Sequence, residues 1–253
     1  MKCALIIPDV HAPFHSQRAW DVMLAVARDL RGEGFHQGPD EIVCLGDFID
    51  AYNLSSHGSR NPRVTINLEK EIFEANLLLN QLDEAFPNAR KVFIEGNHET
   101  RLERFILQNA SALFGVTEIK RLLKFGERLR WEWIPYGPNQ AYKILGSNVL
   151  ARHESLRTTP ALTIREAGSS LFYGHIHRRE FVSKNNLDGT KLFAGCPGWL
   201  GNSRALAFEY VRGIPNWQMG FAVLFFEKNV PYPFFVPIND DFTAVWGGKV
   251  YRG

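Results

Sequence analysis

The chain has 253 residues, enough for one large domain or two small ones with a substantial core. Hydrophobic residues make up 45% and charged residues 22%, which is ordinary for a soluble globular protein. The formal net charge of +2 gives little overall attraction for nucleic acid, although a local basic face stays open. No run approaches the roughly 18 apolar residues that span a membrane, and residues 3–8 are too short for a signal peptide. We therefore expect a soluble, cytosolic protein.

The first half of the chain alternates predicted strands and helices. Continuous apolar runs predict buried strands, and apolar residues at helical spacing predict the helices between them. In order, the elements are strand 3–8, a helix from Ser16, strand 41–45, helix 68–86, strand 91–94 and a helix from about residue 96. We expect Gly32 and Gly34 to end the first helix, and Phe105 to lie on the apolar face of the third. This order predicts a parallel sheet covered by helices.

The second half contains shorter apolar runs separated by turn residues, which predicts a mainly antiparallel sheet packed on the first. The runs are 130–134, 141–145, 148–152, 170–173, 180–183, 191–194 and 221–226, with one helix near 159–167. Asp188-Gly189 is a good hairpin signal. Proline and aromatic residues without a clear period predict an irregular tail from about residue 230. We expect residues 1–253 to form one domain.

Three cysteines are too few and too widely spaced to suggest a disulfide framework. Cys3 and Cys44 lie inside predicted strands, where a free cysteine is usually a small buried hydrophobe.

Five short groups of possible metal ligands lie at or near the ends of apolar runs. They hold five of the eight histidines. In order they are Asp9-Val10-His11, Gly46-Asp47-Phe48-Ile49-Asp50, Gly96-Asn97-His98-Glu99, His153 and Gly174-His175-Ile176-His177. Any one group alone is more often incidental than a metal site. Their joint occurrence favours a metal site built from loops at strand ends.

The residue types in these groups suit two divalent ions. Asp9 and His11 point the same way on an extended chain and can hold one ion together, and the Asp47 carboxylate can bridge two. Further ligands are the Asn97 amide oxygen and the imidazoles of His153, His175 and His177. Carboxylate and imidazole without sulfur favour manganese, with iron or zinc as alternatives. Two ions about 3.5–4 Å apart are typical of sites that promote displacement at phosphorus.

Asp50 and His98 stand beside these ligands without being needed as ligands themselves. An imidazole titrates near neutral pH and can hold or transfer a proton. We therefore expect His98 to act as an acid, with Asp50 orienting it.

The five groups, in this order, resemble the calcineurin-like metallophosphoesterase superfamily, whose pattern is D-x-H, G-D-x-x-D, G-N-H-[DE], H and G-H-x-H. The resemblance implies an α/β sandwich of two packed mixed sheets flanked by helices. It implies one metal held by Asp9, His11, Asp47 and His177, and a second held by Asp47, Asn97, His153 and His175. It also implies that a hydroxide between the two ions attacks phosphorus in line. His98, with Asp50 as its partner, would protonate the leaving oxygen or stabilise the transition state.

Two positions depart from the superfamily pattern. Glu154 follows His153 where many members have glycine. Ala51 stands where the protein Ser/Thr phosphatases carry an arginine that binds phosphate, directly after the second aspartate. The second departure counts against a close relative of the protein phosphatases.

The substrate depends on residues around the metal site, of which the candidates are Arg101, Arg104, His57 and Trp199. Arg101 and Arg104 are three residues apart, so they are neighbours on one helix face that meets either phosphate or only solvent. The first hypothesis is a phosphodiesterase that acts on nucleotides or nucleic acid, and the alternative is a phosphomonoesterase for small molecules or phosphoproteins. A third hypothesis is a non-catalytic, protein-binding scaffold, against which the retention of His98 and of all the ligands counts.

Overall fold

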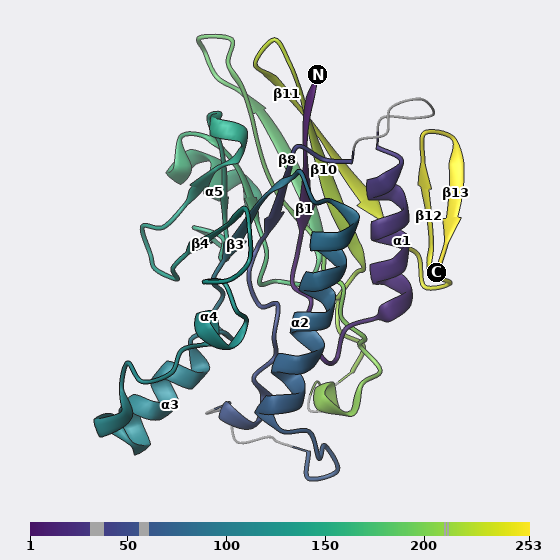
Figure 1. The fold of residues 1–253 in the computed structure, drawn as a ribbon. Coiled ribbons are helices and arrows are strands. Elements are labelled where there is room, and N and C mark those ends of the chain that lie inside the picture. The colour runs from purple at the N-terminus through teal and green to yellow at the C-terminus, as the bar shows by residue number, and fades with distance from the viewer. Residues whose placement is uncertain (31–37, 56–60, 210, 212) are drawn as a thin grey trace.

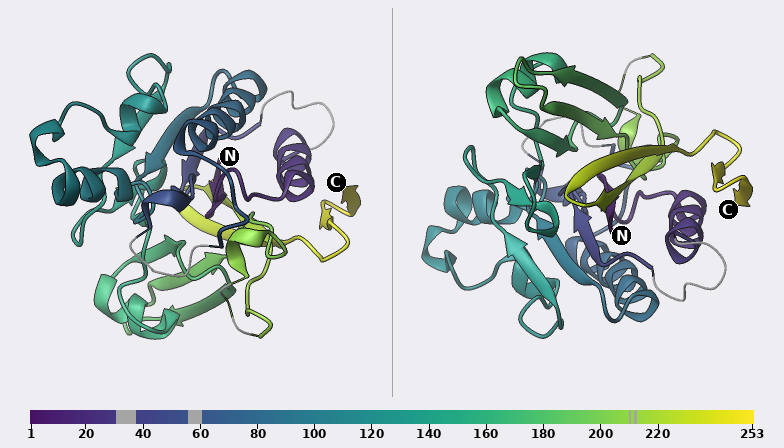
Figure 2. Two further views of the ribbon diagram at one scale, coloured as in Figure 1. Left: turned by 90° about the horizontal axis from the view of Figure 1, so that it is seen from below. Right: turned by 90° about the horizontal axis from the view of Figure 1, so that it is seen from above.

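Two β-sheets pack face to face, and helices cover the outer face of each (Figures 1 and 2). This computed structural model describes residues 1–30, 38–55, 61–209, 211 and 213–253. The expected α/β sandwich of two mixed sheets flanked by helices is confirmed. In the described part of the chain, no helix is both long and apolar enough to cross a membrane.

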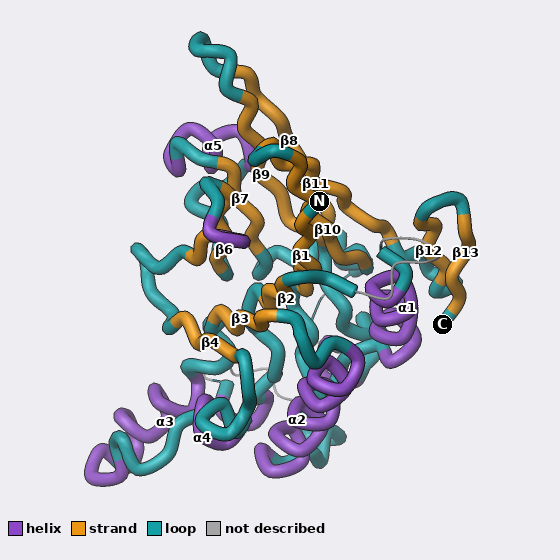
Figure 3. The backbone as a smooth tube through the Cα atoms, turned by 45° about the horizontal axis from the view of Figure 1, so that its top comes forward, coloured by secondary structure: helices purple, strands orange, loops and turns teal. Residues whose placement is uncertain are grey.

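The first sheet contains the three strands predicted in the first half of the chain, in parallel. Its strand order is β11-β10-β1-β2-β3-β4 (Figure 3). The bounds are β1 Lys2–Ile7, β2 Glu41–Cys44, β3 Arg90–Ile94, β4 Trp131–Ile134, β10 Gly220–Glu227 and β11 Val230–Pro237. Assigning 130–134 and 221–226 to the other sheet was wrong, because β4 pairs with β3 and β10 pairs with β1. Short apolar runs do not reveal which strand they will pair with.

The second sheet is mixed rather than mainly antiparallel, which corrects the prediction. Its order is β5-β6-β7-β9-β8. The bounds are β5 Tyr142–Lys143, β6 Val149–Arg152, β7 Ser170–Tyr173, β8 Arg179–Asn185 and β9 Lys191–Pro197. The helix α5 (Pro160–Ala167) connects β6 to β7, and such a crossover makes the two strands parallel. The hairpin predicted at Asp188-Gly189 is confirmed between β8 and β9.

The predicted helices are confirmed, with one change in the third. Ser16 caps the first through its side chain, which accepts the Ala19 N–H, whereas Gly32 and Gly34 lie outside the described residues. The bounds are α1 Gln17–Arg28, α2 Leu68–Ala85, α3 Arg101–Asn109 and α4 Ile119–Leu122, with 3₁₀ turns η1 Tyr52–Leu54, η2 Ser111–Leu113, η3 Ile144–Gly146 and η4 Leu206–Phe208. Helix α3 begins later than predicted, and Phe105 is 43% exposed rather than on the buried face.

The alternation of side chains along β1 explains the layers. Cys3, Leu5 and Ile7 point into the core shared with α1 and α2, whereas Ala4 and Ile6 point into the core between the sheets. Both faces of the strand are therefore buried, as its continuous apolar run predicted. Cys3 and Cys44 are buried, as expected, and Cys196 is buried as well.

The irregular tail predicted from residue 230 is instead ordered into strands. β11 pairs along its length with β10, and a hairpin of β12 (Thr243–Trp246) and β13 (Lys249–Arg252) follows. Pro231, Pro233 and Pro237 occupy alternate positions of β11, which is an edge strand. In an antiparallel pair only every second residue donates to the partner strand, so prolines at the other positions do not interrupt the pairing.

A buried carboxyl group on α2 supports the chain that follows the second group of possible ligands. Both oxygens of Glu71 accept the Tyr52 N–H, at 3.1 and 3.2 Å. Glu71 is fully buried. Burial and the nearby charge of Asp50 raise the pKa of Glu71 to about 8. The protonated form therefore predominates in the folded protein at neutral pH.

We predict that Glu71→Gln makes the free energy of unfolding less dependent on pH. An unfolded glutamate ionises near 4.5 and the buried one near 8, so unfolding between these values releases a proton and rising pH destabilises the wild type. Relative to wild type, the variant should gain stability from pH 5 to pH 8, and each unit of pKa corresponds to about 1.4 kcal/mol. Urea denaturation at both pH values measures this, with Glu69→Gln, at an exposed position on the same helix, as the control. An equal difference at both pH values would contradict the prediction.

Candidate metal centre

The five groups of possible ligands meet at one edge of the two sheets. Asp9, Asp47 and Asn97 follow β1, β2 and β3, which are parallel, so the strands deliver them to the same end of the first sheet. His153 and His175 follow the parallel strands β6 and β7 of the second sheet. Packing of the sheets brings the two sets of loops together.

A first cluster contains Asp9, His11, Asp47 and His177. Each residue offers one ligand atom, and these atoms all lie within 4.8 Å of one another. His11 Nε2 is 3.0 Å from His177 Nε2, which is 3.1 Å from Asp9 Oδ2. Two ring nitrogens and a carboxylate oxygen directed at one point form a set of electron-pair donors that suits a cation.

A second cluster contains Asp47, His153 and His175, with ligand atoms again within 4.8 Å. His153 Nε2 is 2.9 Å from Asn97 Oδ1 and 3.3 Å from Asp47 Oδ1. Asp47 thus belongs to both clusters. A carboxylate shared in this way is the arrangement expected for an aspartate between two ions.

Hydrogen bonds on the far side of the histidine rings fix their orientation. His11 Nδ1 donates to Asp50 Oδ2 at 2.9 Å, and His153 Nδ1 donates to the Leu45 carbonyl at 2.8 Å. In each ring this leaves Nε2 facing the cluster. Metal-binding histidines commonly donate their other N–H to a carboxylate or carbonyl in this way.

The buried charges of His153 and Asp47 also indicate that the clusters favour a cation. Burial by itself would lower the pKa of His153, but the charge of Asp47 outweighs burial and raises it to about 10. Burial would raise the pKa of Asp47, but His153 holds it well below its usual value. The site therefore favours positive charge beside Asp47, which a proton on His153 or a bound cation can supply. Oxygen and imidazole donors without sulfur suit manganese, iron or zinc.

His98 lies next to both clusters. Its backbone N–H donates to Asp47 Oδ1 at 2.9 Å, and its Nδ1 donates to the Asp50 carbonyl at 2.8 Å. Nε2 must accept the hydrogen bond from Arg101 Nη2 at 2.8 Å, because a guanidinium can only donate. Burial lowers the pKa of His98 to about 4, so the ring is neutral.

Asp50 contacts two histidine rings, His11 and His98. Its carboxylate lies 2.9 Å from His11 Nδ1 but 3.7 Å from His98 Nδ1. The closer contact to His98 comes from the Asp50 main-chain carbonyl. A sequence motif gives no information on which atom of a residue makes the contact.

Glu99 has a supporting role that was not predicted from the sequence. Its buried carboxylate accepts backbone N–H groups from Asp47, Phe48, Ile49 and Gly96, at 2.7 to 3.1 Å. Burial raises its pKa to about 7. Glu99 therefore ties the loop after β2 to the loop after β3. The acidic residue at the last position of the G-N-H-[DE] pattern was the sequence feature from which this role could have been predicted.

The backbone at the site is strained and closely packed. His11, Asp47, His175 and His177 have φ values of 54°, 47°, 70° and 58°, in the left-handed region that non-glycine residues seldom adopt. Such residues persist only where surrounding contacts hold them, and they concentrate at functional sites. A Cβ at Gly174 would collide with Asp9 Oδ1, so the absence of a side chain there lets the backbone reach the carboxylate.

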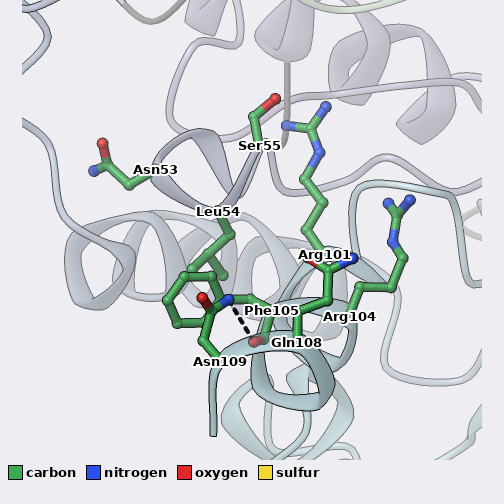
Figure 4. A pocket seen from close by; sticks show the side chains of 8 residues that line it. All are labelled: Asn53, Leu54, Ser55, Arg101, Arg104, Phe105, Gln108 and Asn109. Carbon is green, nitrogen blue, oxygen red and sulfur yellow. Dashed lines mark hydrogen bonds between the residues drawn. The ribbon is translucent and has the colours of Figure 1, made fainter. Parts of the chain in front are cut away.

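The four candidate substrate residues have different surroundings. Trp199 is only 1% exposed, and its ring stacks on His177 with centroids 4.8 Å apart, so it supports a candidate ligand and does not face a substrate. Arg101 and Arg104 line a pocket beside His98 (Figure 4). His57 lies outside the described residues.

Comparison with solved structures gives two similar chains, of which the first supports the fold. The chain is similar to Vps29 from Chaetomium thermophilum, with 10% identity, a TM-score of 0.50, and coverage of 100% of this chain and 97% of that one. A single mutant of Vps29 from Entamoeba histolytica gives 15% identity, a TM-score of 0.41, and coverage of 99% and 97%. A comparison with curated protein sequences gives no match.

Comparison with protein families gives a match over most of the chain. The model of the calcineurin-like phosphoesterase family matches residues 4–194. This range begins in β1 and ends in β9, so it includes all five groups of possible ligands. The chain therefore belongs to the calcineurin-like phosphoesterase family.

Proposed function

We propose that this protein is a binuclear metal-dependent phosphoesterase, a hydrolase that cleaves a phosphodiester of a nucleotide or nucleic acid. The observation that carries the proposal is the convergence of seven possible ligands from five separate segments, with Asp47 in both clusters. Membership of the calcineurin-like phosphoesterase family supports the reaction class.

Each of the two clusters would bind one metal ion. Asp9, His11, Asp47 and His177 would hold one, and Asp47, Asn97, His153 and His175 the other. When bound, two divalent ions supply positive charge to the phosphate oxygens and lower the pKa of the attacking water. We expect manganese, with iron or zinc as alternatives, because the donors are oxygen and imidazole nitrogen.

His98 would act as the general acid that protonates the leaving oxygen. Its Nδ1 is committed to the Asp50 carbonyl, so Nε2 is the nitrogen that would meet a substrate oxygen, once Arg101 Nη2, from which it accepts a hydrogen bond, turns to the substrate phosphate. Burial holds the free ring neutral, and a bound phosphate anion beside it favours the protonated ring. Asp50 positions both His98 and His11, which couples the acid to the first cluster.

The diester assignment is supported by the surroundings of His98. Two guanidinium groups and the exposed ring of Phe105 lie on α3 next to it. Cationic groups combined with an exposed aromatic ring are typical of surfaces that bind nucleic-acid strands. The test is a manganese-supplemented assay of para-nitrophenyl phosphate, its bis ester and single-stranded DNA. Activity on the monoester alone would overturn the diester assignment, and inactivity on all three with two metals bound would favour a scaffold.

We predict that Asp47→Asn loses metal as well as activity. A neutral amide at the shared position removes the negative charge that both clusters use. Metal content after manganese loading, measured by mass spectrometry, should fall from two ions to one or none for each chain, with phosphoesterase activity largely lost. Asp188→Asn, in the exposed turn between β8 and β9, is the matched control and should keep both. Full metal content in Asp47→Asn would refute its assignment as the shared ligand.

We predict that His98→Ala keeps its metal content and loses rate. General acid catalysis contributes roughly 10²- to 10⁴-fold, so kcat should fall by about that factor. The loss should be smaller for a substrate with a nitrophenolate leaving group, because such a good leaving group needs little protonation. Equal losses with good and poor leaving groups would argue that His98 has a different role.

A further inference from the structure

The pocket beside His98 has a composition that the metal clusters do not explain. It has a volume of about 250 Å³ and lies between η1 and α3. Its lining residues are Asn53, Leu54, Ser55, Arg101, Arg104, Phe105, Gln108 and Asn109. The pocket is smaller than the roughly 300–1,000 Å³ that encloses a whole small molecule, so it suits a single chemical group.

The pocket is lined by two cationic side chains, of which Arg101 also lies 3.5 Å from the Asp50 carboxylate. Among the described residues that line it, two are arginines and none is acidic. Arg104 donates to the Asn97 carbonyl at 2.9 Å, and within the described part of the chain no carboxylate lies within ion-pair distance of it. Figure 4 shows Arg101 and Arg104 extending from α3 in the same direction. Two guanidinium groups lining one pocket together with amide side chains favour a phosphate anion.

The position of the pocket next to His98 indicates which part of a bound substrate it would contact. Arg101 Nη2 lies 2.8 Å from His98 Nε2, the nitrogen that faces the leaving oxygen in the proposed function. Arg101 Nη1 lies 2.7 Å from the Asp50 carbonyl. The pocket therefore adjoins the leaving-group side of the reaction and not the side from which water attacks.

We infer that this pocket binds a phosphate carried by the leaving group, so that the substrate is an oligonucleotide strand with a further phosphate next to the scissile one. This inference rests on the proposed function. A nucleic-acid strand fits because it supplies a phosphate and a base together, and Phe105, 43% exposed at the pocket, offers a ring on which a base can stack.

The kinetic test compares three dinucleotides with the manganese-loaded protein. These are TpT, which has only the scissile phosphate, and its phosphorylated forms pTpT and TpTp, one of which carries the extra phosphate on the leaving nucleoside. That form should exceed TpT in kcat/KM by about tenfold or more, since a hydrogen bond to a charged group contributes about that factor. In Arg104→Gln the ratio should fall to near one.

The control is Arg121→Gln, which removes the same charge from an exposed residue of α4. It should keep the wild-type ratio, so a general loss of positive charge is distinguished from loss of the pocket. Cleavage of TpT with a ratio near one for both phosphorylated forms would overturn the inference and leave the proposed function intact. So would a ratio that persists in Arg104→Gln.

A binding measurement tests the pocket independently of turnover. Fluorescence anisotropy of labelled oligothymidylate with metal-free protein should show affinity about tenfold weaker in Arg104→Gln than in wild type or Arg121→Gln. Equal affinities in all three would overturn the inference. Weaker binding by Arg104→Gln, together with inactivity on every ester, would support the pocket and reject the proposed phosphoesterase.

Discussion

Burial of carboxyl groups at one edge of the two sheets is the constraint on which this site depends. Asp9, Asp47, Asp50 and Glu99 are each at most 3% exposed. An uncompensated buried carboxylate costs several kcal/mol, so each must find a donor or a cation. Asp9 accepts the His175 N–H, Asp50 pairs with His11, and Glu99 accepts four backbone N–H groups. Asp47, between the clusters, accepts the His98 N–H and lies 3.3 Å from His153 Nε2.

This constraint connects the hydrophobic core to the chemistry. The first sheet provides Asp9, Asp47 and Asn97, whereas the second provides His153 and His175. The distance between the two sets is therefore fixed by the side chains that pack between the sheets. Close packing resists small shifts, so the core holds the ligands in place without a covalent link. The positive φ angles at the ligand loops are tolerated for the same reason, because contacts on both sides hold the backbone.

The sequence predicted the parts of the molecule that depend on local patterns. Buried runs identified β1, β2 and β3, and the ordered groups identified the residues that meet at the strand ends. Pairing between distant strands was not predictable, because β4 and β10 have the same apolar character as strands of the second sheet. The order in the C-terminal segment was missed because prolines obscure a strand, and only its place at the sheet edge accommodates them.

The contacts around His98 could not be predicted from the sequence, for a different reason. The motif places Asp50 near His98, but only the folded loops show that the carboxylate of Asp50 serves His11 while its carbonyl serves His98. Arg101, three residues after His98, reaches back to the ring because α3 begins there. The same guanidinium thus contacts the proposed acid and lines the adjoining pocket. A group bound in that pocket must compete with His98 for Arg101, which links occupancy of the pocket to the state of the acid.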